Sequence, residues 1–242
     1  DDNFLEGNIA SFGQLSNLRV LYAEDNQLTG TLSDTLLQPW TIHMTELDIS
    51  NNLINSTIPA SMFSMSKLEI LDLHGNNFRG SIPSISKANE VMRFLALYEN
   101  QLTGQIPATI GNLKALQHLD LAKNKFVSPL PDTLGLYTDL QYLFLGGNNF
   151  SQRPMPDFLW TLTGLRELSM KNNSITGTIP SFFGSLTALK LLDLDANRFT
   201  GTIPQEIGLL GGLKFLLLNR NSLSGTIPST FTLLYQLGKE PT

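Results

Sequence analysis

A recurring phrase, LDI or LDL, places an aspartate at the same position in four repeats: Asp48, Asp72, Asp120 and Asp193. Of the side chains that could act in catalysis, these have the most suitable spacing. If each phrase forms one strand, Asp48 and Asp72 lie on adjacent strands about 5 Å apart, which is the separation of the two carboxylates in a retaining glycosidase. An acid catalyst needs an apolar pocket that raises its pKa, however, and an open strand face does not supply one. We therefore expect these aspartates not to be catalytic.

Other side chains that could do chemistry are few. The chain has three histidines, His43, His74 and His118, and no cysteine. At their spacing they assemble neither a nucleophile with its base nor a zinc site. The sequence therefore predicts a protein that is not an enzyme and that has no metal site and no cofactor.

The composition excludes some classes of binding partner. The formal net charge is -5, from 16 Lys and Arg residues against 21 Asp and Glu residues, and the basic residues form no cluster of the kind that neutralises phosphates. We therefore expect no nucleic-acid partner. No apolar run approaches the roughly 20 residues that span a bilayer, so we expect no membrane contact by this segment. The 41% of hydrophobic residues can supply a substantial core.

The elements that position these side chains come from one repeated phrase. Alignment on its asparagine, at steps of 24 to 26 residues, gives nine ladder positions: Asn26, Asn52, Asn76, Asn100, Asn124, Asn148, Asn173, Asn197 and Asn221. Ahead of each stands the apolar pattern L-x-x-L-x-L, with Met44 and Met92 replacing the first Leu in two copies. A fixed period of this length predicts a solenoid. We expect one domain over 1–242, with a partial repeat at 1–17 and nine repeats that start at 18, 44, 68, 92, 116, 140, 165, 189 and 213.

Each part of the phrase has a physical role. The central L-x-L alternates with a period of two, so it predicts one short strand per repeat with its leucines inward, and stacked repeats make a parallel sheet. The asparagine side chains should form a ladder that satisfies backbone groups where the chain turns away from the sheet. In the tail, each proline fixes φ and leads into a short helical turn; these prolines are Pro59, Pro83, Pro107, Pro131, Pro156, Pro180, Pro204 and Pro228.

The unit LxxLxLxxNxLxGxIPxxLGxLxx resembles the plant-type leucine-rich repeat of receptor-like kinase and receptor-like protein ectodomains and of polygalacturonase-inhibiting proteins. The resemblance runs from Asn3 to about Leu237. It implies an α/β solenoid, a right-handed superhelix with a parallel β-sheet on its concave side and short helical or 3-10 turns on its convex side. It also implies an extracellular or cell-surface signalling protein that binds a peptide, glycan, protein or co-receptor on its concave or lateral face.

A secreted binding protein is the alternative, either an enzyme inhibitor of the polygalacturonase-inhibiting kind or an adhesion protein. The chain also departs from the family's pattern, since it lacks the usual cysteine-containing caps and Ser33 takes the place of a proline. The repeat that starts at 140 carries an extra residue in FSQRPMP, and the strand expected after Leu237 fails at GKEPT. These departures predict either a fragment of a longer ectodomain or a non-plant homologue without caps.

The varied places of the repeat predict where binding occurs. Because the leucines point inward, the third, fifth and seventh places of each strand unit face the concave surface. Aromatic residues favour strands in general, but a patch of neighbouring exposed aromatics predicts a binding site. Small residues beside the patch predict a shallow depression: Ala96, Ala122, Gly146 and Gly147. The predicted ligand-binding residues are Phe94, Tyr98, His118, Tyr142 and Phe144.

Three N-x-S/T sequons are candidate glycosylation sites, at Asn55, Asn149 and Asn172. Such sites are used only in a secretory protein, although sequons also arise by chance in a chain rich in Asn, Ser and Thr. Asn55 and Asn149 follow their strands, toward the convex or lateral side. Asn172 is expected at the edge of the concave face, where a glycan would restrict binding.

Overall fold

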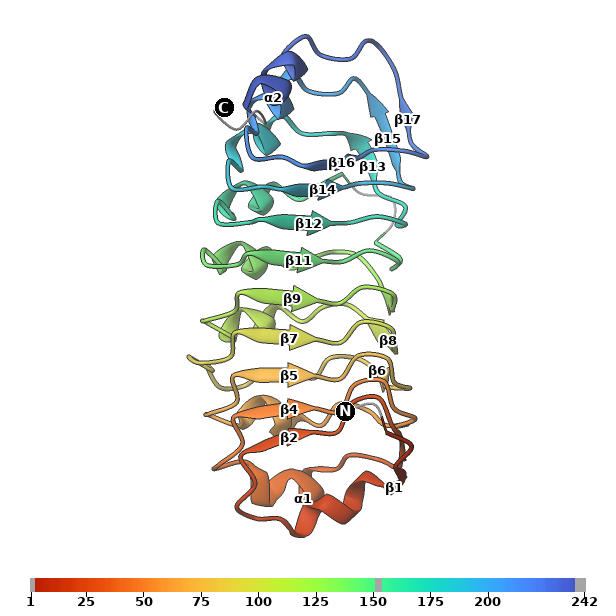
Figure 1. The fold of residues 1–242 in the computed structure, drawn as a ribbon, viewed down its shortest axis with the longest axis vertical. Helices are drawn as coiled ribbons and strands as arrows, with labels where there is room; N and C mark the ends of the chain where they lie inside the picture. Colours follow the sequence, from red (N-terminus) through yellow and green to blue (C-terminus); the bar gives the residue numbers. More distant parts are fainter. Residues whose placement is uncertain (1–2, 151–153, 238–242) are drawn as a thin grey trace.

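The computed structural model describes residues 3–150 and 154–237. Within this part of the chain, one short strand from each repeat joins a parallel sheet that runs the length of the solenoid (Figure 1). Spatial order follows chain order, so each strand pairs with those of the repeats before and after it. The strands are β2 (Val20–Tyr22), β4 (Glu46–Asp48), β5 (Ile70–Asp72), β7 (Phe94–Ala96), β9 (His118–Asp120), β11 (Tyr142–Phe144), β12 (Glu167–Ser169), β14 (Leu191–Asp193) and β16 (Phe215–Leu217).

The register of this sheet keeps equivalent places of the repeat side by side. His118 pairs with Phe94 on one neighbouring strand and with Tyr142 on the other. The central leucine of each inner strand points into the core, and Leu71 and Leu119, for example, are fully buried. Because side chains alternate along a strand, the places before and after each leucine form straight columns on the concave face.

The convex side is covered by short helices that follow prolines. Proline is the N-cap of six 3-10 helices, where its fixed φ and missing N–H cost nothing. These helices are η3 (Ala60–Ser64), η4 (Ala108–Asn112), η5 (Asp132–Leu136), η6 (Asp157–Thr161), η7 (Ser181–Ser185) and η8 (Gln205–Leu209). The expected helical turns therefore lie on the expected side for these prolines.

The first and last repeats carry the remaining helices. Ser33, which stands where other repeats have proline, caps a helix instead, since its Oγ accepts a hydrogen bond from the amide of Leu36 at 3.2 Å. No helix in the described ranges is long and apolar enough to cross a membrane. The helices of these end repeats are η1 (Ile9–Gln14), α1 (Asp34–Leu37), η2 (Gln38–Trp40) and α2 (Phe231–Leu237).

The expectation of a helical turn is wrong after Pro83, because no helix is assigned between residues 81 and 93. A buried asparagine closes this connection instead. Asn89 is 2% exposed, and its Nδ2 donates to the carbonyl of Met65 at 3.1 Å. Its Oδ1 accepts hydrogen bonds from the amides of Val91 and Met92 at 2.9 and 2.7 Å. These bonds satisfy backbone groups that a helix would have satisfied elsewhere.

Short strands beyond the asparagines form lateral sheets that the sequence did not predict. They are β1 (Glu6–Asn8) with β3 (Gln27–Thr29), then β6 (Arg79–Gly80), β8 (Gln101–Gly104) and β10 (Lys125–Phe126), and finally β13 (Thr176–Thr178), β15 (Arg198–Gly201) and β17 (Ser222–Leu223). Among the described residues between β10 and β13, the lateral pairing consists of one bridge from Val127 to Asn149. Part of the FSQRPMP insertion, residues 151–153, lies outside the described residues.

The asparagine ladder is present along the whole stack. From Asn52 onward, each Nδ2 donates to two carbonyls of its own turn and one of the preceding repeat, and each Oδ1 accepts an amide of the preceding repeat. Asn124 shows the pattern: its Nδ2 lies 2.9 Å from the carbonyl of Leu97, and its Oδ1 lies 2.9 Å from the amide of Leu102. Each side chain therefore joins two repeats through backbone groups that no strand partner reaches.

The residue before each ladder asparagine adopts the left-handed backbone conformation. Gly75 and Gly147 do so without strain, but seven other repeats place a residue with a Cβ there, among them Glu99, Lys123 and Ala196. The same turn geometry is thus imposed on every repeat, whatever residue occupies the place. Asp25, Asn51 and Asn172 are of types that favour this conformation, but Glu99, Lys123, Ala196 and Arg220 are not, so residue type alone does not mark the feature in every repeat.

Candidate functional site

Four of the predicted ligand-binding residues form one aromatic cluster on the concave face. Phe94 on β7 stacks on His118 on β9, with ring centroids 4.3 Å apart and planes inclined by 21°. His118 also contacts the rings of Tyr142 and Phe144 on β11, at centroid distances of 5.5 and 5.6 Å. The in-register pairing of the three strands places these rings in contact. Because each ring packs on its neighbour, the cluster is held in place before any ligand arrives.

His118 lies at the centre of this cluster and is half-buried. Burial lowers the pKa of His118, although the charge of Asp72 opposes the shift. The imidazole is therefore neutral at physiological pH and behaves as one more aromatic ring of the wall.

Tyr98, the fifth predicted residue, belongs to a separate stack that includes a residue sequence reasoning missed. Its ring lies 4.1 Å from that of His74, with an interplanar angle of 9°. His74 Nδ1 in turn lies 2.7 Å from a carboxylate oxygen of Asp72. Burial lowers the pKa of His74, but this hydrogen bond and the charges of nearby acids outweigh it, so the pKa is raised. Burial, and after it the charges of Asp72 and Asp120, raise the pKa of Tyr98 to about 12.

A depression lies beside these aromatic rings, but Ala96, which was expected to line it, is fully buried and does not. The depression has a volume of about 330 Å³, and Tyr98, Phe144, Asp120 and the small residues Ala122 and Gly146 line it. Its rim carries two ion pairs, from Lys123 to Glu99 and from Lys171 to Asp193. We call this hollow the concave depression. A second hollow of about 280 Å³ lies along Phe94, His118 and Tyr142 and is bordered by Arg93, Gln117 and Gln141.

The aspartates of the LDI and LDL phrases satisfy backbone groups at strand ends. Each carboxylate accepts a hydrogen bond from the amide two residues later, at distances of 2.9 to 3.2 Å, in Asp48, Asp72, Asp120 and Asp193. Asp72 and Asp193 are only 8% and 3% exposed, so their side chains are part of the folded interior rather than of an open surface. Sequence reasoning placed them on the right face but missed this burial.

The expectation that this face cannot raise a carboxyl pKa is wrong at Asp120. Burial raises the pKa of Asp120 to about 6, against the hydrogen bond from the amide of Ala122, which lowers it. The residues opposite Asp120 in the sheet are Ala96 on β7 and Phe144 on β11. Because no carboxylate stands opposite Asp120, the arrangement of a retaining glycosidase is not formed there.

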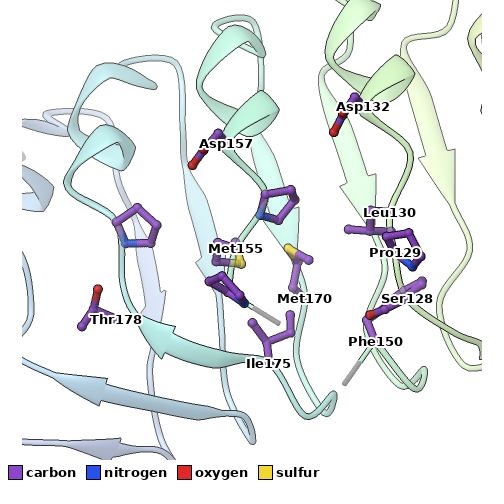
Figure 2. A pocket seen from close by; sticks show the side chains of 13 residues that line it. Ser128, Pro129, Leu130, Asp132, Phe150, Met155, Asp157, Met170, Ile175 and Thr178 are labelled. Atoms are coloured by element: carbon purple, nitrogen blue, oxygen red, sulfur yellow. The ribbon is translucent and has the colours of Figure 1, made fainter. Parts of the chain in front are cut away.

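A third hollow lies on the lateral side, where the lateral sheets are interrupted. It has a volume of about 440 Å³, and core side chains reach its floor, among them Met155, Met170 and Ile175 (Figure 2). Asp132 and Asp157, each in the first turn of a 3-10 helix, stand beside it. We call it the lateral cavity. No cluster of metal-ligating side chains is found in the described part of the chain, here or elsewhere.

The three sequon asparagines are all exposed, but they lie on different surfaces. Asn55 and Asn149 follow their ladder asparagines on the lateral side, and the sequon serine of Asn149, Ser151, is outside the described residues. Asn172 borders the concave depression and has a left-handed φ of 48°. A glycan on Asn172 would therefore stand at the edge of the aromatic site.

The stacked parallel strands, the asparagine ladder and the proline-led 3-10 turns define a solenoid of short repeats with one open sheet face. The family model described as a leucine-rich repeat region matches residues 43–198, and the model described as a leucine rich repeat matches 188–210 and 212–234. The chain belongs to the leucine-rich-repeat family, and its repeats are of the plant type. A comparison with the curated proteins found no match.

Solved structures share this fold. The plant peptide hormone receptor RGFR1, in complex with RGF2, is 31% identical with a TM-score of 0.85 over 96% of this chain and 36% of that chain. The ectodomain of the Arabidopsis receptor kinase HAESA, in complex with an IDA peptide hormone, is 31% identical, with a TM-score of 0.87 over 97% of this chain and 39% of that chain. A plant ice-binding protein is 25% identical, with a TM-score of 0.81 over 95% of this chain and 73% of that chain. The chain thus spans well under half the length of the two receptor chains.

Proposed function

We propose that this chain is the peptide-binding part of an extracellular receptor-type protein and that its ligand lies across the concave depression and the aromatic cluster. The observation that carries the proposal is the in-register packing of Phe94, His118 and Tyr142 along a hollow of about 280 Å³. Phe144 joins this cluster to the concave depression, which it lines. Aromatic side chains held in place beside a hollow dominate the binding energy of many interfaces. The solved receptors with peptide hormones bound support a peptide as the class of ligand.

Receptor status, signalling and a co-receptor are further parts of this proposal. HAESA has been solved with IDA and the co-receptor SERK1, which is a property of that protein. In this chain, the lateral sheet of β13, β15 and β17 is a surface on which a second protein could lie. The variable places of the repeat lie on the concave face while the core places are constant, which supports a role in recognition rather than catalysis.

The aromatic cluster is expected to control peptide affinity. Peptides selected from a random heptapeptide library on the immobilised protein should bind the Tyr142→Ala, Phe144→Ala double variant at least about 30-fold more weakly than the parent, since two aromatic anchors are removed. Isothermal titration calorimetry measures the affinities, and circular dichroism verifies the fold. Trp160→Ala is the control, because this tryptophan is 55% exposed on the convex helix η6. Unchanged affinity in a folded double variant would refute the aromatic cluster as the binding site and would point to the lateral surface formed by the loops after the asparagine ladder.

Glycosylation tests the extracellular part of the proposal. In protein secreted from eukaryotic cells, Asn55 and Asn149 should carry glycans, since both are exposed on the lateral side. Mass spectrometry of the secreted protein gives their occupancy, and Asn55→Gln should remove one glycan mass. If Asn172 is occupied as well, Asn172→Gln should strengthen binding of the selected peptides. If mass spectrometry finds no glycan on any of the three asparagines, the sequons no longer support an extracellular location.

A further inference from the structure

Asp120 differs from the equivalent aspartates of neighbouring repeats in its partners. The carboxylate of Asp48 accepts a hydrogen bond from Ser50 Oγ at 2.6 Å, and that of Asp72 from His74 Nδ1 at 2.7 Å. In each case the partner stands two residues later. At Asp120 that place is Ala122, whose amide donates at 2.9 Å but whose methyl group offers nothing to the carboxylate. Among the described residues, no other group donates a hydrogen bond to Asp120.

Further along the same column, Asp193 also has side-chain partners. Its carboxylate lies 3.2 Å from Ser169 Oγ and 3.5 Å from Lys171 Nζ. The second oxygen of Asp120 therefore has no donor among the described residues, although the group is half-buried. A charge held in such a place is costly unless a ligand pairs with it.

Aromatic rings lie on two sides of Asp120, and small side chains lie on its other sides. Phe144 stands opposite it on β11, and Ala96 stands opposite it on β7. One face of the Tyr98 ring is covered by His74, so its other face is turned toward the next strand, where Ala122 leaves room. Tyr98, Asp120 and Phe144 all line the concave depression. A carboxylate between aromatic rings suits a cation, because ring faces attract positive charge.

The other charges of the concave depression neutralise one another. Lys123 pairs with Glu99, and Lys171 pairs with Asp193. On the side of β5, outside the lining of the depression, the Asp72 carboxylate is hydrogen-bonded to His74 Nδ1. Asp120 is the remaining charge, so the depression presents one uncompensated negative group at its floor.

We propose that the concave depression binds the cationic side chain of a lysine or arginine in the peptide ligand, with its charged group on the Asp120 carboxylate and its stem against Tyr98 and Phe144. This inference rests on the proposed function and adds the chemical class of one anchor residue. Arginine fits both partners, since its planar guanidinium donates two parallel hydrogen bonds to a carboxylate and stacks on aromatic faces.

Such a site weakens on acidification. Burial raises the pKa of Asp120 to about 6, so the carboxylate is charged above this pH and becomes protonated as the pH falls through it. The titratable groups around it are Asp72, His74 and Glu99 in the repeats of β5 and β7, and His118 on its own strand. Lys123, Lys171 and Asp193 stand at the rim of the depression. His74, whose pKa is raised, gains positive charge over the same range and adds repulsion toward a cation. Affinity for a cationic peptide should therefore be at least tenfold lower at pH 5 than at pH 7.5.

The test uses the random heptapeptide library on the parent, on Asp120→Asn and on Asp48→Asn. Asp120→Asn keeps an oxygen for the amide of Ala122, and Asp48→Asn makes the same change of charge in the same column, where Ser50 already binds the carboxylate. We expect peptides from the parent and from Asp48→Asn to share a lysine or arginine at one position. Replacing that arginine by the neutral isostere citrulline should weaken binding at least tenfold to the parent and less than twofold to Asp120→Asn.

The outcomes separate the two proposals. Peptides that bind through the aromatic cluster but show no cationic position, or whose binding is unchanged in Asp120→Asn, overturn the cation site and leave peptide binding standing. Equal enrichment of basic peptides on Asp120→Asn would assign the preference to the overall negative charge and would also overturn the site. A library without any specific binder contradicts peptide recognition itself, and the cation site with it.

Discussion

Replacing Asn124 by alanine is expected to lower the free energy of unfolding by about 3 kcal/mol. The change removes donors to the carbonyls of Leu97, Leu121 and Ala122 and the acceptor for the amide of Leu102. Asn124 is buried, so these backbone groups would be left inside the protein without water to replace the lost partner. A buried group without a partner costs about 1–3 kcal/mol, and several are affected here.

Chemical denaturation followed by circular dichroism measures this loss. Asn77→Ala is the matched control, because Asn77 follows the ladder residue Asn76 directly, is not buried, and its side chain bonds that of Gln101 at 3.3 Å. The control should stay within about 0.5 kcal/mol of the parent. Because repeats are stabilised by their neighbours, Asn124→Ala should also broaden the transition. A denaturation midpoint equal to that of the parent would refute the stabilising role of the ladder.

Replacing Gly184 by alanine is expected to destabilise the protein by about 3 kcal/mol through overpacking. Gly184 lies in η7, and a Cβ on it would stand 2.5 Å from the carbonyl oxygen of Glu206 and 2.9 Å from its carbonyl carbon in η8. Those are backbone atoms, which cannot move aside as the end of a side chain does. The two helices would have to separate, and the core beneath them would lose contacts.

Gly212→Ala is the control for this prediction. A Cβ on Gly212 would meet no atom closer than 3.7 Å, and its φ lies outside the left-handed region. Its stability should change by less than about 0.5 kcal/mol, since alanine fits there and restricts the unfolded chain slightly. Thermal unfolding of both variants distinguishes close packing from a general effect of glycine replacement. Equal unfolding temperatures for Gly184→Ala and Gly212→Ala would contradict the contact between η7 and η8.

Much of the fold could be predicted because each constant residue meets the same environment in every repeat. Leu71, Asn124 and Pro107 recur at fixed places, and a residue that recurs at a period of about 24 must fill a site that is rebuilt each time. Prediction failed where one repeat departs from the others. After Pro83 the chain forms no helix, and Asn89 satisfies the backbone instead, which no repeated pattern indicates.

The candidate site was predicted in part. Alignment of the repeats was sufficient to place Phe94, His118 and Tyr142 side by side, because the register of a parallel solenoid sheet follows from the repeat. His74 was missed as a ring partner of Tyr98 because it stands in a repeat with no other aromatic residue on this face. The burial of Asp72 and Asp193 was missed because alternation along a strand gives a direction, not a depth.

The sequence by itself determined the solenoid, its strands, the ladder and the face that varies, since these depend on periodicity and on which side of a strand a residue lies. Only the tertiary structure decided which side chains of that face have partners. His74 turns to Asp72 and covers one face of Tyr98, while Ala122 leaves the Asp120 carboxylate with a backbone amide alone. Such contacts depend on the rotamers of residues two positions or one repeat apart, which packing selects and a pattern of residue types does not contain.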